Sequence, residues 1–179
     1  ETARAQATMR ANLRALAAAA DGTEAVVSTA SGCGVTVKDY GRLLPEDEAA
    51  RRIAGMTLDA AEFLHGLDTT WTRAGDHRRV AWQAPCTLQH GQGAAGLVED
   101  LLRRAGYELV PVAEPHLCCG SAGSYSMLQP SLSGRLKRRK LDHLEAAAPD
   151  VIATANAGCQ LHLASESSVP VVHWLDLLQ

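Results

Sequence analysis

The chain has 179 residues, of which 46% are hydrophobic and 21% are charged, and its formal net charge is −3 at pH 7. This composition is typical of a globular protein with a sizeable core. The negative charge argues against binding along a phosphate backbone, so no nucleic-acid partner is expected. No run of about 18 apolar residues could span a bilayer, and the first 20 residues have the wrong order of charge and apolarity for a signal peptide. We therefore expect a cytoplasmic protein without a direct membrane span.

The first part of the chain alternates helical and β-forming segments. Residues 2–20 contain no strong helix breaker and are rich in good helix formers, and AVVSTA at 25–30 is typical of a buried strand. The acidic residues after Pro45 favour a helix start, because negative charge stabilises the N-terminus of a helix. A further helix is predicted at 57–67, with Thr57 as its N-cap.

The second part of the chain continues this alternation. Apolar, β-branched runs predict strands at 78–85, 107–112, 151–155 and 169–174. Segments rich in Ala, Leu and Arg predict helices at 93–105 and 131–148. Strands separated by helices indicate a parallel sheet with helices on its faces. The predicted fold class is therefore α/β.

A basic run lies within the last of these helices. RLKRRK at 135–140 contains five basic residues in six. Such a run usually forms a solvated helix face, and a docking patch for an acidic partner is the alternative. We predict the solvated face.

Two segments of the chain share one pattern, which indicates an internal repeat. Residues 9–34 and 136–160 each contain a helix, a turn with an Asp, a strand written VVSTA or VIATA, and a Gly-Cys ending. The first copy has no room for the cysteines that precede the second. We therefore expect the chain to begin inside a repeat and to belong to a longer protein. This reasoning divides it into 1–75, the end of a first repeat with a connecting segment, and 76–179, a complete second repeat.

The second repeat carries cysteines with the spacing of ligands. Cys86 is followed, after 31 residues, by the adjacent pair Cys118 and Cys119, and Cys159 begins a C-x-x-H motif that His162 completes. Each cysteine segment follows a predicted strand, and the carboxyl ends of parallel strands meet at one edge of a sheet. A vicinal pair makes an awkward disulfide, and five cysteines is an odd number. Thiolate-rich sites select zinc or iron–sulfur clusters.

Other chemistries have weaker support. Cys33 is expected to be structural, because it ends the incomplete repeat and Thr36 occupies the position of a further ligand. Cys118 and His116 could form a nucleophilic pair, but no third member is evident. GSAG at 120–123 lacks the Lys-Ser/Thr ending of a phosphate-binding loop.

The motif C-x31-CCG-x38-C-x-x-H resembles the cysteine-rich CCG domain, which is shared by heterodisulfide reductases and many other oxidoreductases. The matching segments are PCTLQHGQG at 85–93, CCGSAG at 118–123, QPSLS at 129–133 and NAGCQLHL at 156–163. Within this family the chain is most similar to the iron–sulfur subunits of glycolate oxidase, with a further match in STASGCGVTVKDYGRLL at 28–44. The resemblance covers essentially the whole chain.

The resemblance implies a ligand set and a cofactor. The implied ligands are Cys86, Cys118, Cys119 and Cys159, with His162 where the general motif has a further cysteine. In heterodisulfide reductase relatives such repeats bind noncubane [4Fe–4S] clusters, whereas some other CCG domains are associated with zinc. Many relatives have His-Asp-Pro-Cys-His around the first ligand, where this chain has Gln-Ala-Pro-Cys-Thr.

The resemblance also implies a function and partners. Such subunits carry an N-terminal ferredoxin-like region, which is missing from this sequence, and they receive electrons from a flavoprotein subunit that oxidises glycolate to glyoxylate. We expect an electron-transfer subunit that relays these electrons toward a quinone, in the cytoplasm or peripherally at the inner face of the membrane. The isolated chain is expected to be inactive, because it contains neither a flavin-binding region nor a ferredoxin-type C-x2-C-x2-C run.

Two alternatives stay open at this point. The first is a structural zinc domain that assembles the subunits, in which the four cysteines close a tetrahedral site. The second is a metal-free thiol module with a redox-switchable vicinal pair. The subunits of lactate oxidation look alike at this level, so the assignment of glycolate as the hydroxy acid rests on the resemblance.

Overall fold

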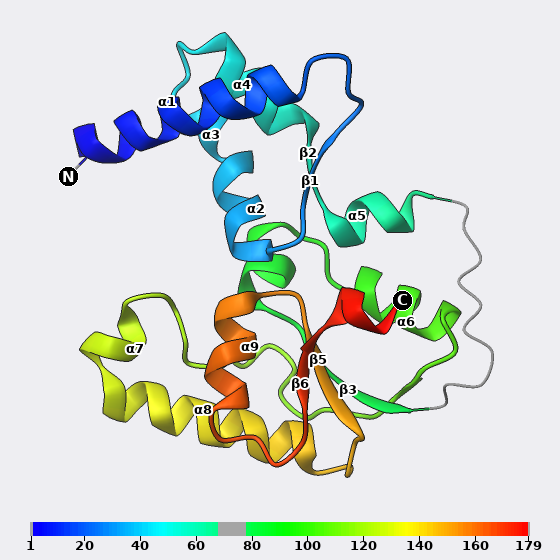
Figure 1. Cartoon of the computed structure of the whole chain (residues 1–179). Helices are drawn as coiled ribbons and strands as arrows, with labels where there is room; N and C mark the ends of the chain where they lie inside the picture. The colour runs from blue at the N-terminus through cyan, green and yellow to red at the C-terminus, as the bar shows by residue number, and fades with distance from the viewer. Residues whose placement is uncertain (1, 68–77, 179) are drawn as a thin grey trace.

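The structure is a computed structural model that describes residues 2–67 and 78–178 (Figure 1). It has an N-terminal part, drawn at the top of Figure 1, and a C-terminal part below it. Each part contains a parallel sheet, and helices flank both sheets. This arrangement confirms the predicted α/β fold with parallel sheets.

The N-terminal part consists of two short paired strands and the helices that flank them. Its elements are α1 (Thr2–Ala19), β1 (Val26–Ser28), α2 (Ser31–Lys38), α3 (Tyr40–Leu43), α4 (Glu48–Met56), β2 (Thr57–Asp59) and α5 (Ala60–His65). β1 and β2 pair in parallel, with Val26 opposite Thr57. Leu13 of α1, Leu44 and Ile53 of α4 meet in a small apolar core. This core holds the helices against the two strands.

The prediction that Thr57 caps a helix was wrong. Thr57 begins β2, where pairing with β1 holds the backbone extended. The cap is Asp59, whose carboxylate accepts a hydrogen bond from the Ala61 N–H, while Glu62 accepts one from the Asp59 N–H. This capping box satisfies N–H groups that the first helical turn leaves without partners. The helix therefore starts after the strand.

The C-terminal part is a four-stranded parallel sheet in the order β4-β3-β5-β6. Its elements are β3 (Arg79–Gln83), the π-helical turn η1 (Thr87–Gly91), α6 (Leu97–Arg104), β4 (Glu108–Leu109), α7 (Tyr125–Leu128), α8 (Pro130–Glu145), β5 (Val151–Thr154), α9 (Ala157–Ala164), β6 (Val171–His173) and the 3₁₀ turn η2 (Trp174–Leu177). The predicted strands and helices of this part are all present, although several are shorter than predicted.

The two faces of this sheet hold different apolar clusters. Val80 and Trp82 of β3 face a cluster that includes α6 and η2, whereas Ala81 faces a cluster that includes α8 and α9. Successive residues of a strand point to opposite faces, which explains the separation. Cys119 and Cys159 belong to the second cluster. Cys119 and Cys159 are thus anchored on the α8 and α9 side of the sheet, whereas Ala84 and Leu88, on either side of Cys86, belong to the other cluster.

Helix α8 contains the basic run, and the prediction of a fully solvated face was wrong. Lys137 and Lys140 are only 7% and 0% exposed. They lie four residues before Leu141 and Leu144, which are buried against the sheet, and residues four apart share one face of a helix. The three arginines of the run are exposed. Helical period, and not the charge of the run, decides which of its residues are buried.

The two segments compared in the sequence form α1-β1-α2 and α8-β5-α9, each with the order helix–strand–helix. Cys33 is the third residue of α2, and Cys159 is the third residue of α9. That the two segments are copies of one repeat stays a prediction. The predicted boundary between 75 and 76 lies outside the described residues.

The N-terminal part meets the C-terminal part at the carboxyl edge of the larger sheet. The N–H of Ser31 donates to the Ala155 carbonyl at 3.1 Å, and the hydroxyls of Ser31 and Thr87 lie 2.8 Å apart. His173 Nε2 lies 2.9 Å from the carbonyl oxygen of Thr29. Figure 1 shows α2 between the upper helices and the lower sheet. The start of α2 is therefore held beside the segments that carry the cysteines.

Within the described residues, no helix combines the length and apolarity needed to cross a bilayer.

Candidate metal centre

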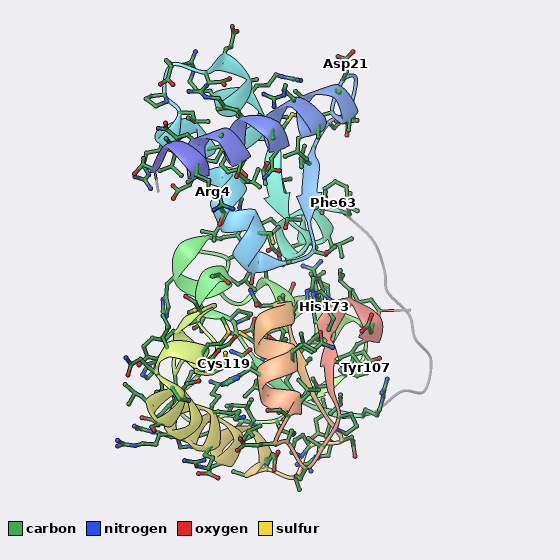
Figure 2. The ribbon with its side chains drawn as sticks, turned by 60° about the vertical axis from the view of Figure 1, so that its left-hand side comes forward. Arg4, Asp21, Phe63, Tyr107, Cys119 and His173 are labelled. Carbon is green, nitrogen blue, oxygen red and sulfur yellow. The ribbon has the colours of Figure 1, made fainter. Side chains whose placement is uncertain are left out.

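The four candidate cysteines follow three neighbouring strands of the sheet. Cys86 comes three residues after β3, the pair Cys118 and Cys119 comes after β4 and a loop, and Cys159 comes after β5. In the sheet β4, β3 and β5 are adjacent and parallel, so their carboxyl ends lie side by side. Figure 2 shows Cys119 in the lower part of the molecule, close to α9. The topology brings together the segments that the sequence predicted to converge.

All four cysteines line one cavity of about 340 Å³. The other lining residues are small or short and polar: Gly32, Thr87, Ser121, Ala122, Gly123, Asn156 and Gly158. Gly32 comes from the N-terminal part, at the start of α2. The cavity thus lies at the carboxyl edge of the sheet and has one wall from the other half of the molecule.

The thiols run from the protein interior to its surface. Cys119 and Cys159 are buried, Cys118 is half-buried and Cys86 is exposed. The sulfurs of Cys119 and Cys159 are 3.1 Å apart. The N–H of Gly120 donates to Cys118 Sγ at 3.3 Å. The site therefore has a closed inner end and an open outer end.

The environment of Cys86, Cys118 and Cys119 favours their protonated forms when no metal is bound. Burial raises the pKa of Cys86, and the Cys118 thiol adds to that rise. The Cys119 thiol and burial raise the pKa of Cys118 strongly. Cys118 lowers the pKa of Cys119. The opposite effects of Cys159 and of burial are larger, and together they raise the pKa of Cys119 to about 12. Neighbouring thiolates would repel one another in a poorly solvated place, so a bound cation is needed to hold these thiols deprotonated together.

Local backbone features position each cysteine. Asn156 caps α9 and accepts hydrogen bonds from the N–H groups of Gly158 at 2.9 Å and Cys159 at 3.3 Å, which fixes Cys159 in the first turn. Gly120 has a φ of +91°, a backbone conformation that favours glycine. Its carbonyl accepts a hydrogen bond of 2.7 Å from the Ser133 hydroxyl of α8. The cysteine pair is therefore fastened to α8 immediately after its second member.

His162 is not among the residues that line the cavity. It lies in the last turn of α9, and its Nε2 is 3.2 Å from the hydroxyl oxygen of Ser133 in α8. Burial lowers the pKa of His162, and the nearby Lys137 lowers it further. Cys33 is exposed and lines a separate, smaller pocket beside α2. The structure thus brings the four cysteines together and leaves His162 and Cys33 outside the cavity.

Sequence reasoning missed several residues that shape the site. Lys140, Ser133 and Asn156 are not cysteine or histidine, so a search for ligands passes over them. Asn156 could have been found, because an asparagine ahead of a helix is a common N-cap. The burial of Lys140 could have been read from the helical period that it shares with Leu144.

The donor set fits a thiol-bound metal group. Over residues 2–67 and 78–178, no group of three or more His, Cys, Asp or Glu side chains is arranged to hold a single metal ion as it stands. The four sulfurs are instead spread around one cavity. Cysteine sulfur is the donor that soft and borderline metals prefer. Sulfurs distributed around a cavity suit a group with several metal atoms better than one tetrahedral ion.

An α/β unit with four cysteines at the carboxyl edge of a parallel sheet defines a cysteine-rich domain, and the comparisons with known proteins agree. The sequence profile of the cysteine-rich domain CCG matches residues 80–164. The chain is 41% identical over 162 residues to the glycolate oxidase iron-sulfur subunit of Escherichia coli K12, covering 88% of the chain and 40% of that protein. It is 30% identical over 165 residues to lactate utilization protein A of Geobacillus kaustophilus, covering 89% of the chain and 67% of that protein.

A further relative is the probable glycolate oxidase iron-sulfur subunit of Bacillus subtilis, 28% identical over 172 residues, of which the chain covers 38%. The chain belongs to the family of proteins with the cysteine-rich CCG domain. It spans well under half the length of the two glycolate oxidase subunits that it matches.

Proposed function

We propose that this chain is the cluster-bearing part of an iron–sulfur electron-transfer subunit in a complex that oxidises a small 2-hydroxy acid. The observation that carries the proposal is the convergence of Cys86, Cys118, Cys119 and Cys159 on one cavity. The names of the relatives support it, because two of them are iron–sulfur subunits of glycolate oxidases and a third serves in lactate utilization. Glycolate is the proposed substrate of the whole complex, because the relative with 41% identity bears that name.

The four cysteines are the proposed ligands of the cluster, which would be of the [4Fe–4S] type, including its noncubane form. A bound cluster would take up and pass on single electrons. The chain holds the sulfurs in place, and the N–H of Gly120 donates to Cys118 Sγ, a contact of the kind that tunes such centres. The buried inner thiols keep water from one side of the site. Cys86 is exposed, so the opposite side of the site would be open to a partner protein.

The proposed partners are a flavoprotein subunit, which would supply the electrons, and a ferredoxin-like region of the same protein. Electron transfer toward a quinone would place the complex in the cytoplasm at the inner face of the membrane. The chain itself would contribute ligation, orientation and tuning, not turnover of the hydroxy acid.

A second candidate is a structural zinc domain, favoured by the presence of four cysteines, which is the ligand number of a closed tetrahedral site. Zinc would tie together three loops at the sheet edge and stabilise the fold. The third, a metal-free thiol module, would use the 3.1 Å approach of Cys119 and Cys159.

Anaerobic purification followed by metal and sulfide analysis and an absorption spectrum separates these candidates. Iron with acid-labile sulfide, and broad visible absorption that bleaches on reduction, is the expected result. Equimolar zinc without iron would replace the proposal by the structural zinc domain. The absence of both metals, after iron and sulfide have also been offered anaerobically, would leave the thiol module.

A further inference from the structure

Lys140 is a buried lysine with an unusual set of partners. Its side chain is fully buried on the sheet side of α8. Its ammonium donates to two backbone carbonyls, those of Glu114 at 3.3 Å and Pro115 at 3.1 Å. Among the described residues, no carboxylate lies within ion-pair distance of Lys140. The Glu114 carboxylate itself binds Arg139 and His143.

Lys137 provides the contrast on the same helix. It is also buried, at 7% exposure, and lies one turn earlier. Its ammonium pairs with the Glu166 carboxylate at 2.5 Å and donates to the Ser165 hydroxyl at 2.8 Å. Lys137 therefore has the acidic partner that a buried lysine normally requires. Lys140 has only neutral oxygens.

A buried ammonium without a counter-charge destabilises a fold, because desolvation of the charge is only partly offset by neutral acceptors. Burial lowers the pKa of Lys140, and the thiols of Cys119, Cys118 and Cys159 oppose this by raising it. Two sources of negative charge lie near Lys140: the Glu114 carboxylate, which already binds Arg139 and His143, and the cysteines, once metal binding has deprotonated them.

The position of Lys140 explains how it reaches the site without lining it. The next residue, Leu141, and Leu144 share an apolar cluster with Cys119 and Cys159. The carbonyls that Lys140 binds belong to the loop that leads into the cysteine pair. Lys140 itself does not line the cavity. It can act on the site through its charge and through the loop, but not as a ligand.

We propose that the ammonium of Lys140 is the buried counter-charge of the metal centre formed by Cys118, Cys119 and Cys159. This inference rests on the proposed metal-binding function. Metal binding converts neutral thiols to thiolates and leaves the site with net negative charge, whether the metal is one divalent ion or a cluster. A fixed positive charge in a medium of low dielectric constant stabilises that product. For a redox-active group it also favours the reduced state, which carries one more negative charge, and so raises the reduction potential.

The test measures Co²⁺ binding to the metal-free, 179-residue chain under anaerobic conditions, read from the thiolate-to-cobalt absorption. We expect Lys140→Met to weaken Co²⁺ binding by about tenfold or more, because a charge–charge interaction at low dielectric constant is lost. Lys140→Gln should weaken it similarly, since it keeps a donor for the two carbonyls but has no charge. The control is Lys137→Met, which removes a buried lysine of the same helix and should leave the affinity near that of the wild type.

The outcomes separate the two proposals. Co²⁺ affinity that is unchanged in both Lys140 variants, with the wild type binding, overturns the role of Lys140 alone. Weakening in Lys140→Met but not in Lys140→Gln shows that the hydrogen bonds matter and not the charge, which also overturns it. A wild-type chain that gives no thiolate-to-cobalt absorption and also takes up no iron and sulfide overturns the metal-binding function together with this inference. Circular dichroism of each metal-free variant confirms that the comparison is made between folded chains.

The same variants give a second readout once the chain is loaded with iron and sulfide. The midpoint potential of Lys140→Gln should lie below that of the wild type, and that of Lys137→Met should coincide with it. A potential that is equal in the wild type and Lys140→Gln would contradict the inference, even if both hold the cluster equally well.

Discussion

The hydroxyl of Ser133 donates a hydrogen bond of 2.7 Å to the carbonyl oxygen of Gly120, the residue directly after the cysteine pair. This contact joins the start of α8 to the loop that carries Cys118 and Cys119. Gly120 itself has a positive φ of +91°, and its N–H donates to Cys118 Sγ. The direction in which the two thiols point is therefore set by one glycine and one serine.

Gly120→Ala should disrupt the site. A Cβ at Gly120 would lie 2.5 Å from the Ser133 carbonyl oxygen, which is backbone and cannot rotate away. The positive φ adds a cost of about 1–2 kcal/mol for a residue with a Cβ. We expect a lower melting temperature of the metal-free chain and a loss of bound metal, measured by thermal denaturation and elemental analysis.

Gly123→Ala is the matched control for this change. Gly123 also has a positive φ, of +59°, and lines the cavity, but a Cβ there would meet no atom within 4 Å. The variant should therefore show the conformational cost without the collision and retain its metal. Equal metal loss in the two variants would show that the backbone conformation of the loop, and not the close approach of α8, determines binding.

The four cysteines should behave differently from Cys33. Cys119→Ser should lower the bound metal and the melting temperature of the loaded protein together, because the free energy of metal binding contributes to the folded state. Cys33→Ser should leave the metal content unchanged, since Cys33 lies in a separate pocket. Metal analysis and thermal denaturation of both variants check this. A comparable loss of metal in Cys33→Ser would bring the N-terminal part into the site.

The sequence predicts the convergence of the cysteines because it follows from topology. Cys86, the Cys118 pair and Cys159 each come after a strand, and parallel strands place their carboxyl ends together. The sequence does not predict α2, because its segment SGCGVTVK is rich in glycine and β-branched residues. Contacts with η1 stabilise this helix, and Gly91 permits them, since a Cβ there would come within 2.9 Å of Val35. Tertiary packing of this kind leaves no local signal.

The basic run in α8 shows that the charge of a segment does not predict which of its residues are buried. A count of basic residues cannot separate Lys137 and Lys140, which are buried, from their exposed neighbours. The helical period can separate them, but only once the buried face is known from Leu141 and Leu144. The sequence also does not predict the direction of the His162 side chain, because C-x-x-H spacing places two side chains near each other without fixing which way each one points.

Glu114→Gln should make the stability of the chain depend less on pH in the acidic range. Hydrogen bonds from Arg139 and then from His143 hold the pKa of Glu114 below its ordinary value of 4.5. A lowered carboxyl pKa means that the charged form stabilises the fold above 4.5, and that this stabilisation is lost as the pH falls through the lowered pKa. The melting temperature of the wild type should exceed that of Glu114→Gln at pH 7, and the gap should close below pH 4.5.

The control for this prediction is Glu99→Gln, which removes a carboxylate of α6 for which no ion pair is found within the described residues. Its melting temperature should follow that of the wild type across the same pH range. A gap between wild type and Glu114→Gln that persists unchanged at pH 3 would show that the effect of Glu114 does not come from its charge.

The contact between His162 and Ser133 bears on whether His162 is a metal ligand. Ser133 has a single hydroxyl hydrogen, and the short contact to the Gly120 carbonyl uses it. The Ser133 oxygen can then only accept from His162, so Nε2 of the imidazole carries a hydrogen. In this arrangement Nε2 is not available as a ligand, and Nδ1 is not placed to serve instead, because His162 does not line the cavity. The geometry therefore favours a role in positioning Ser133 over the ligand role that the sequence predicts.

His162→Ala should accordingly keep the full amount of metal and the wild-type absorption spectrum. Its stability should fall by about 1 kcal/mol, the usual effect of one lost hydrogen bond. Ser133→Ala should cost more, because it also leaves the Gly120 carbonyl without its donor, and it should lower metal retention. Elemental analysis, absorption spectra and denaturant unfolding of the two variants provide the comparison. If His162→Ala instead loses metal or changes the spectrum while Ser133→Ala does not, then His162 is a ligand and its imidazole turns into the cavity when the metal binds.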